Sequence, residues 1–126
     1  MNIEREKEFV HQFHYDARNL EWEKENGTPE TNLNVQFQLV DNLEAFPETD
    51  TAISGMLSFV IVLENLLVSG HLSQLSYIRG EVIKEREQLD QDKMSELAAP
   101  LFDLLKRLTY EVTEIALDQP GINLEF

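Results

Sequence analysis

Three side chains in this sequence could hold a metal ion together. His14 and Asp16 are two residues apart, so on a strand they would share a face, and His71 could join them from a neighbouring strand. His11 lies three residues from His14 and would fall on the opposite face. Such a site would make the protein a small metal-dependent enzyme. Polar residues on a solvated or interfacial sheet face explain the same pattern, and we favour that interpretation, with no metal.

Paired carboxylates are the other groups that could do chemistry. Glu21 with Glu23, and Glu85 with Glu87, could transfer protons only if burial raised the pKa of one member of a pair. Both pairs lie among other charged residues, which is typical of solvated surface. The sequence has no nucleophile elbow, glycine-rich phosphate loop or His-Glu-x-x-His helix. It also has no cysteine, which excludes disulfides, zinc ribbons and thiol catalysis. We therefore predict a protein that is not an enzyme and uses no cofactor.

Composition limits the partners. The 126 residues fit a single domain, and the formal net charge is -14 from 24 acidic and 10 basic residues. Between Glu25 and Ile78 there is no Lys or Arg. Nucleic acids and anionic membranes attract clustered cations, so neither is an expected partner. A partner steered by charge should instead be basic. The longest apolar run, residues 59–63, is too short to cross a bilayer and no signal peptide is visible, which favours a cytoplasmic protein.

Alternation of apolar and polar residues predicts four antiparallel strands. They cover about residues 9–23, 32–39, 56–63 and 66–78. The first should bend or bulge near Arg18, and Gly70 is the candidate position for a second bulge. Residues before Phe9 are expected to be frayed, and the acidic residues 41–50 should form a loop. Residues 79–90 are left open between strand, linker and helix.

A helical period begins near Asp92. Its apolar stripe consists of Met94, Leu97, Leu101, Leu104, Leu105, Leu108, Val112, Ile115 and Ala116. Pro100 should break the stripe, so that the main helix begins there. Residues 118–121 end the helix, and the apolar tail 122–126 should pack back on the body. The predicted fold is α+β: one domain, 1–126, with a four-stranded antiparallel sheet packed by one long C-terminal helix.

The third strand has apolar residues on both faces. Residues 57, 59, 61 and 63 point one way, while Met56, Val60 and Val62 point the other. One helix covers only one face of a sheet. Either the N-terminal segment, the acidic loop and the C-terminal tail cover the second face, or another protein chain does, through self-association or client binding. We favour another chain, because the outer face of the second strand carries amides and not the lysines that protect an exposed edge.

Three passages carry a family resemblance. They are Tyr15 followed by Leu20-Glu21-Trp22-Glu23, then Pro100-Leu101-Phe102 with Arg107, and finally Pro120-Gly121-Ile122-Asn123-Leu124. In these passages and in the order of elements the chain resembles SecB, the bacterial export chaperone. It looks closest to an uncharacterised Gram-positive bacterial family with a SecB-like fold.

The resemblance implies a homo-oligomer, built from dimers that pair into tetramers, which holds unfolded clients against apolar grooves. SecB also uses acidic sheet residues to dock on the export ATPase. Glu23 matches the glutamate of that docking pair, whereas Arg18 or Asn19 stands in place of the aspartate, which argues against this docking. Other SecB-like proteins serve antitoxins, so the fold does not identify the client.

The predicted function is binding of extended or unfolded polypeptides on an oligomeric apolar surface. The residues predicted to line the groove or interface are Phe13, Tyr15, Trp22, Val60 and Val62. Glu21 and Glu23 are predicted to face a basic partner. The alternative is a scaffold or dedicated partner for one specific protein, such as an antitoxin.

Overall fold

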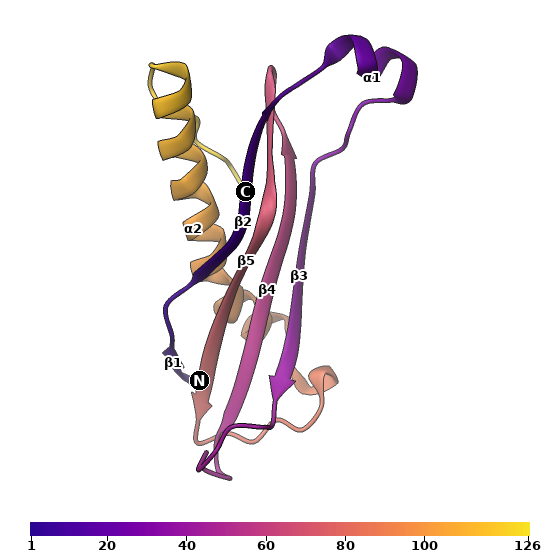
Figure 1. Ribbon diagram of the computed structural model, residues 1–126. Helices are drawn as coiled ribbons and strands as arrows, with labels where there is room; N and C mark the ends of the chain where they lie inside the picture. Colours follow the sequence, from indigo (N-terminus) through magenta and orange to yellow (C-terminus); the bar gives the residue numbers. More distant parts are fainter.

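The computed structural model describes residues 1–126 as an antiparallel sheet with one long helix against one of its faces (Figure 1). The elements in chain order are β1 (Asn2–Arg5), β2 (Phe9–Ala17), α1 (Leu20–Asn26), β3 (Asn32–Val40), β4 (Thr51–Val62), β5 (Leu66–Arg79), the 3-10 helix η1 (Arg86–Gln88) and α2 (Gln91–Leu117). The predicted α+β class with a long C-terminal helix is confirmed. The sheet has five strands and not four. None of the helices is long and apolar enough to span a membrane.

The two long strands β4 and β5 form the centre of the sheet. β3 pairs with the outer side of β4, from Asn32 opposite Val60 to Val40 opposite Ala52. β2 and β1 follow one another along the outer side of β5. The N-terminal residues were expected to be frayed, and this is wrong: β1 pairs with the last residues of β5, so the charged opening segment extends the sheet.

The first long strand was predicted to continue to residue 23, but it ends at Ala17 and a helix follows. Asn19 caps this helix, because its side chain accepts a hydrogen bond of 3.1 Å from the backbone N–H of Trp22. Glu21 and Glu23 lie in the first turn, where the helix dipole favours carboxylates. The irregularity lies earlier than predicted, between Val10 and Gln12.

Pro100 lies inside α2, which runs without a break from Gln91 to Leu117, so the predicted start of the main helix at Pro100 is wrong. Asp90 caps the helix by accepting a hydrogen bond of 2.8 Å from the N–H of Lys93. Proline has no N–H, so the carbonyl of Glu96 has no partner within the helix. The Arg5 guanidinium of β1 donates to this carbonyl oxygen at 2.8 Å and replaces the missing bond.

The core lies between α2 and one face of the sheet. Leu101 and Leu105 of α2 are fully buried against Leu57 of β4 and Leu72 of β5. The predicted stripe extended to Ile115 and Ala116, but both are exposed, and the helix instead buries two threonines in its last turns. Thr113 accepts a hydrogen bond of 2.8 Å from the N–H of Ile122, so the tail packs back on the body as expected.

The segment that the sequence left open, residues 79–90, is neither a strand nor part of the long helix. It contains only the short η1, whose Gln88 side chain accepts hydrogen bonds from the N–H groups of Lys84 and Glu85. Ile83 and Leu89 on either side are buried and belong to the core. The segment passes beside β3 on its way to α2 (Figure 1).

Candidate functional site

The five residues predicted to line one groove lie in three different places. Phe13 and Tyr15 are on the side of β2 that faces α2, where the Phe13 ring lies 5.9 Å from the ring of Phe59. Val60 and Val62 point to the opposite face of the sheet, because they alternate with buried residues of β4. Trp22 is 56% exposed on α1, which lies beyond the end of the sheet (Figure 1). The chain alone does not bring the five together, and their roles stay predictions.

The two glutamates predicted to meet a basic partner have different surroundings. Glu23 is buried and accepts hydrogen bonds from Arg18 at 2.6 and 3.1 Å. These bonds lower the pKa of Glu23, and they raise the pKa of Arg18. Arg18 also donates to the carbonyl oxygens of Leu63 and Glu64, so the pair fastens α1 to the β4–β5 hairpin. Glu21 is exposed, whereas a partner would reach Glu23 only by opening this pair.

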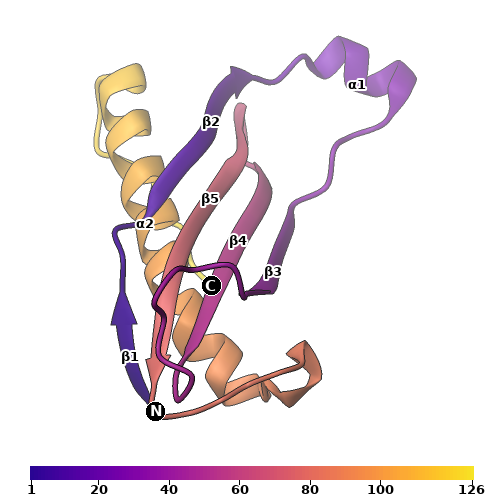
Figure 2. The same cartoon turned by 60° about the horizontal axis from the view of Figure 1, so that its bottom comes forward.

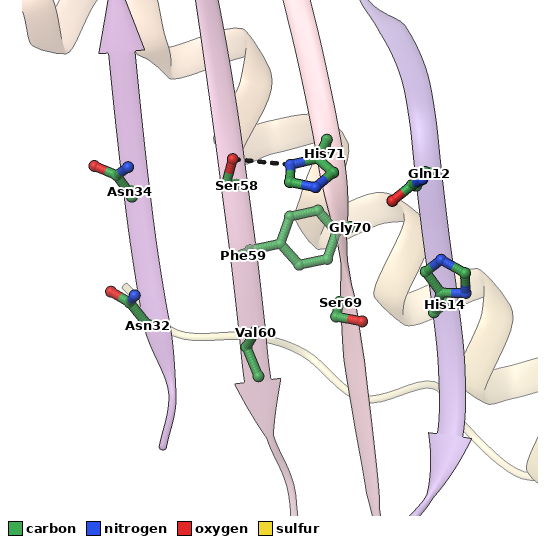
Figure 3. Close-up of a pocket in the computed structure, with 10 residues that line it drawn as sticks. All are labelled: Gln12, His14, Asn32, Asn34, Ser58, Phe59, Val60, Ser69, Gly70 and His71. Atoms are coloured by element: carbon green, nitrogen blue, oxygen red, sulfur yellow. Dashed lines mark hydrogen bonds between the residues drawn. The ribbon is translucent and has the colours of Figure 1, made fainter. Parts of the chain in front are cut away.

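The face of the sheet that α2 does not cover, which we term the open face, carries no charged residue over β3, β4 and β5 apart from Arg79 at the end of β5. It consists of the even-numbered residues of β3 and β4, the odd-numbered residues of β5, and Phe9, His11, Gln12, His14 and Asp16 of β2. Asp16 and Arg79 lie at its two ends. Figure 3 shows its middle, with α2 behind the sheet and the residues that line a hollow over Gly70. The hollow measures about 270 Å³.

Amides, hydroxyls and imidazoles dominate this open face. His71 Nδ1 and the Ser58 hydroxyl are 2.9 Å apart on adjacent strands (Figure 3). His11 Nε2 lies 2.7 Å from the hydroxyl of Ser73. No three His, Asp or Glu side chains gather as a metal site, and the strand register sets His14 opposite Ser69 and not beside His71. The surface can therefore donate and accept hydrogen bonds across its whole width.

The acidic loop covers only one end of the open face. Residues 41–50 cross in front of β4 and β5 there (Figure 2), and the Phe46 ring lies 5.7 Å from that of Tyr77. Arg79 lies over both rings and pairs with Glu4 at 2.7 Å and with Asp50 at 3.1 Å. The other two segments that could have covered this face lie elsewhere: the N-terminal segment is at the sheet edge, and the C-terminal tail packs on the helix side.

The outer edge of β3 has no backbone partner in the chain. β3 pairs only with β4, and none of the hydrogen bonds outside the strand ladders involves its backbone. Its nine residues contain no charged residue and no proline, and their register with β4 has no shift. An exposed sheet edge is usually protected against pairing with other chains by charged residues, a proline or a bulge. The opposite edge is protected in this way: it is divided between β1 and β2, and β2 has a bulge and Asp16.

Two hollows flank the edge of β3, one on each side of the sheet. The hollow on the helix side measures about 370 Å³ and is lined by apolar side chains that include Val35, Leu89 and Met94. The hollow on the open side, of about 440 Å³, is lined by Gln36, Gln38 and other residues. Arg86 of η1 borders both. Sequence reasoning noted the unprotected amide face of this strand but missed η1, because residues 79–90 carry no clear period.

Comparison with known proteins agrees with this fold. A crystal structure of a protein of unknown function from Streptococcus agalactiae is 56% identical, with a TM-score of 0.92 over 100% of this chain and 98% of that one. The Mycobacterium tuberculosis Rv1957 SecB-like chaperone, solved in complex with a ChAD peptide from the Rv1956 HigA1 antitoxin, is 14% identical, with a TM-score of 0.59 over 98% of this chain and 88% of that one. No curated protein matches the chain.

The second of these structures shows that the fold is SecB-like, so the resemblance predicted from the three sequence passages is confirmed. The family match covers residues 1–126 and carries the description "Protein of unknown function (DUF1149)". The chain therefore belongs to the DUF1149 family and has a SecB-like fold.

Proposed function

We propose that this protein is a non-catalytic, chaperone-like protein that binds extended or unfolded segments of other polypeptides along the edge of β3. The observation that carries the proposal is this edge: nine residues without a charge, a proline or a bulge, whose outward backbone groups have no partner. An extended segment that adds as a strand would supply those partners. Main-chain hydrogen bonds would give the affinity, and they do not depend on the sequence of the segment.

The two hollows would receive the side chains of the added strand. Side chains of a strand alternate between its faces, so every second one would enter the apolar hollow beside Met94. The others would lie against the amides of Gln36 and Gln38. The net charge of -14 favours segments that carry lysine or arginine, and exposed Glu21 adds to that field. We expect the protein to act in the cytoplasm as a homo-oligomer, a dimer or a tetramer.

The M. tuberculosis relative supports a polypeptide ligand, because a SecB-like chaperone was solved there in complex with a peptide from an antitoxin. The same observation also favours the second candidate, a dedicated partner of one specific protein. The two candidates differ in selectivity. A general chaperone would retain many unrelated segments, whereas a dedicated partner would bind one protein at fixed stoichiometry and ignore peptides of unrelated sequence.

A pair of N-methylated peptides tests strand addition. In an added strand, the N–H groups of alternate residues point toward the edge and the others point to solvent. An extended, apolar and basic peptide should bind, and methylating one set of alternate nitrogens should abolish binding. Methylating the other set is the matched control and should leave binding nearly unchanged. Fluorescence anisotropy of labelled peptides measures the affinity of the two methylated peptides. An equal loss of affinity whichever set of alternate nitrogens is methylated would contradict pairing with β3.

A protein variant tests the hollow on the helix side. Met94→Lys places a charge where apolar side chains of the client should lie, whereas Ile115→Lys places the same charge at an 81% exposed position of the same helix. Wild type and the Ile115 variant should suppress light scattering by a denatured, aggregation-prone enzyme at molar excess, and the Met94 variant should do so less. If wild type leaves the scattering unchanged, the chaperone-like function is wrong.

A further inference from the structure

We infer that the open face of the sheet binds the open face of a second copy of this chain, so that two sheets pack face to face. This inference names the surface for the self-association that is part of the proposed function, but it does not depend on polypeptide binding at β3. It rests on the charge, the hydrogen-bonding groups and the size of the open face.

Charge identifies the open face as the place where two copies can meet. Charged residues make up 27% of the chain, and the net charge is -14. Yet the face carries none across β3, β4 and β5 until Arg79 at one end, where the acidic loop covers the sheet. A solvated face of so acidic a protein has no reason to lack carboxylates, whereas the cores of interfaces are depleted of charged residues. Two copies of like charge repel least where neither presents an ionised group.

The hydrogen-bonding groups favour an identical partner over a different one. The amides of Asn32, Asn34 and Gln36 and the hydroxyls of Ser58 and Ser69 each donate and accept. Two such faces related by a two-fold axis can satisfy one another, since each patch meets a copy of itself. A basic partner would require carboxylates at this face, and an apolar client would leave these amides without partners.

Apolar groups and the hollow provide packing within this polar surface. Met56 is 39% exposed and Phe9 is 60% exposed, and both lie on the open face, where they pair with Ser73 across the sheet. A hollow of about 270 Å³ on this face is lined by Ser58, Val60, Ser69 and His71, with Gly70 at its floor (Figure 3). Side chains of the second copy that protrude, such as those of Met56, can fill such hollows, as in other sheet-on-sheet packings.

The size of the face suits a stable dimer. The open face is four strands wide, with strands about 4.8 Å apart, and about ten residues long, at about 3.3 Å per residue. The product of this width and length is roughly 600 Å² in flat projection. The relief of the side chains raises the accessible area toward the roughly 800 Å² per partner of a standard interface. Face-to-face packing leaves the edge of β3 at the rim, so a dimer of this kind keeps its outward backbone groups and the hollow on the helix side free, while the hollow beside Gln36 lies at the border of the interface.

Sedimentation velocity with two glutamate variants tests the inference. Wild type should sediment with twice the chain mass of 14.6 kDa at micromolar concentration. Val60→Glu places a carboxylate in the middle of the open face and should give a monomer, and Ile115→Glu, on the outer side of α2, should remain a dimer. Circular dichroism and melting temperature establish that both variants fold. A monomeric wild type, or a folded Val60 variant that still dimerises, would overturn the inference.

The two proposals can fail separately in this design. The monomeric Val60 variant should still bind the extended peptide, and methylating only one of the two sets of alternate nitrogens should abolish that binding. If the Val60→Glu variant dimerises like wild type and the peptide still binds, only the open-face inference fails. If wild type dimerises through the open face and no peptide binds, only the polypeptide-binding function fails.

Discussion

Gly70 lies where the backbone of β2 closely approaches β5. It lies in β5 between Phe13 of β2 and Phe59 of β4, and a Cβ at this position would overlap the carbonyl oxygen of Gln12. The bulge between Val10 and Gln12 brings that carbonyl over the glycine. The sequence marked Gly70 as a possible second bulge, and this is wrong: Gly70 pairs in register with Phe13 and Phe59, and the irregularity lies in β2, between Val10 and Gln12.

Gly70→Ala should therefore displace β2 from β5. Because the added methyl group meets backbone atoms that cannot rotate away, the cost should be about 1–3 kcal/mol in the free energy of unfolding. Ser69→Ala, on the neighbouring residue, is the matched control and should change it by less than about 0.5 kcal/mol. Urea unfolding measures both, and hydrogen exchange should show the loss of protection in β2. Equal stability of the two variants would contradict the close approach.

Asp50 gives the stability a dependence on pH. Its carboxylate accepts hydrogen bonds from the N–H of Gly80 at 2.7 Å and from Arg79 at 3.1 Å, which lower its pKa from the ordinary value. A carboxyl whose folded-state pKa is depressed stabilises the fold above its unfolded value, near 4, and this stability is lost as the pH falls through the lower folded pKa.

Asp50→Asn should accordingly be less stable than wild type at pH 7, and the difference should shrink as the pH falls below about 4. Asparagine keeps an acceptor for Gly80 but loses the charge that faces Arg79, so the remaining difference reports the ion pair. Urea unfolding at pH 7, 5 and 3 measures this. Glu48→Gln, at an exposed position in the same loop, should show no such pattern. A constant difference across this range would contradict the lowered pKa.

At the scale of elements, β1 and α2 depend on each other. Pro100 leaves the carbonyl of Glu96 without a helical donor, and Arg5 reaches it from the sheet. A helix that contains a proline is therefore completed by a strand from the other end of the chain. Propensity alone predicted a break at the proline, because the donor that compensates for it is 91 residues away in the sequence.

A double-mutant cycle measures this dependence. Arg5→Ala should cost about 1 kcal/mol in the free energy of unfolding, since it removes the side-chain donor to the Glu96 carbonyl. In a Pro100→Ala background the alanine N–H can bond to Glu96 within the helix, so the same substitution should cost much less. The coupling energy should therefore differ from zero. Additive effects of the two substitutions would show that Arg5 does not replace the missing helical bond.

The strands with the clearest alternation were predictable and the short elements were not, while β4 and α2 were recognised but begin earlier than predicted, at Thr51 and Gln91. β3 and β5 alternate over nine and fourteen residues and were placed within a few residues of their observed ends. Residues 20–23 form too short a segment to separate a period of 2 from one of 3.6, so the cap at Asn19 decided the outcome. β1 is charged and exists through its pairing with β5, a contact across the chain that no local pattern contains.

The candidate site was predicted in part for the same reason. Alternation of Val60 and Val62 with buried residues revealed a second sheet face, and the amides of β3 revealed an unprotected edge. Which residues surround that edge could not be predicted, because η1 and Met94 reach it from segments about 50 residues later in the chain. The intramolecular partner of Glu23 was equally invisible, since Arg18 lies near it only after α1 has formed.

For the whole molecule, charge and association oppose each other. Every copy carries a net charge of -14, while the surface inferred to join copies is uncharged. Self-association should therefore become tighter as salt rises, because screening reduces the repulsion between copies; the Debye length falls from about 30 Å at 0.01 M to about 10 Å at 0.1 M. Sedimentation at these two ionic strengths measures the change. An interface made of ion pairs would weaken over the same range.

Binding of a basic peptide to β3 should respond to salt in the opposite direction. Attraction between the peptide and the acidic protein decreases with screening, so its affinity should fall as salt rises. A neutral peptide of the same apolar pattern is the control and should show little change. If salt changes the affinity of neither peptide, apolar content alone determines which segments bind, and the expectation of a basic partner is wrong.

The position of Trp22 has a consequence for spectroscopy. It is the single tryptophan of the chain, and it is more than half exposed on α1, beyond the end of the sheet. Native emission should already resemble that of an indole in water, so fluorescence will follow unfolding poorly. A molecule that covers α1 should instead shift the emission to shorter wavelength. The chain thus carries an intrinsic optical reporter for contacts at α1 that is nearly silent toward the fate of its core.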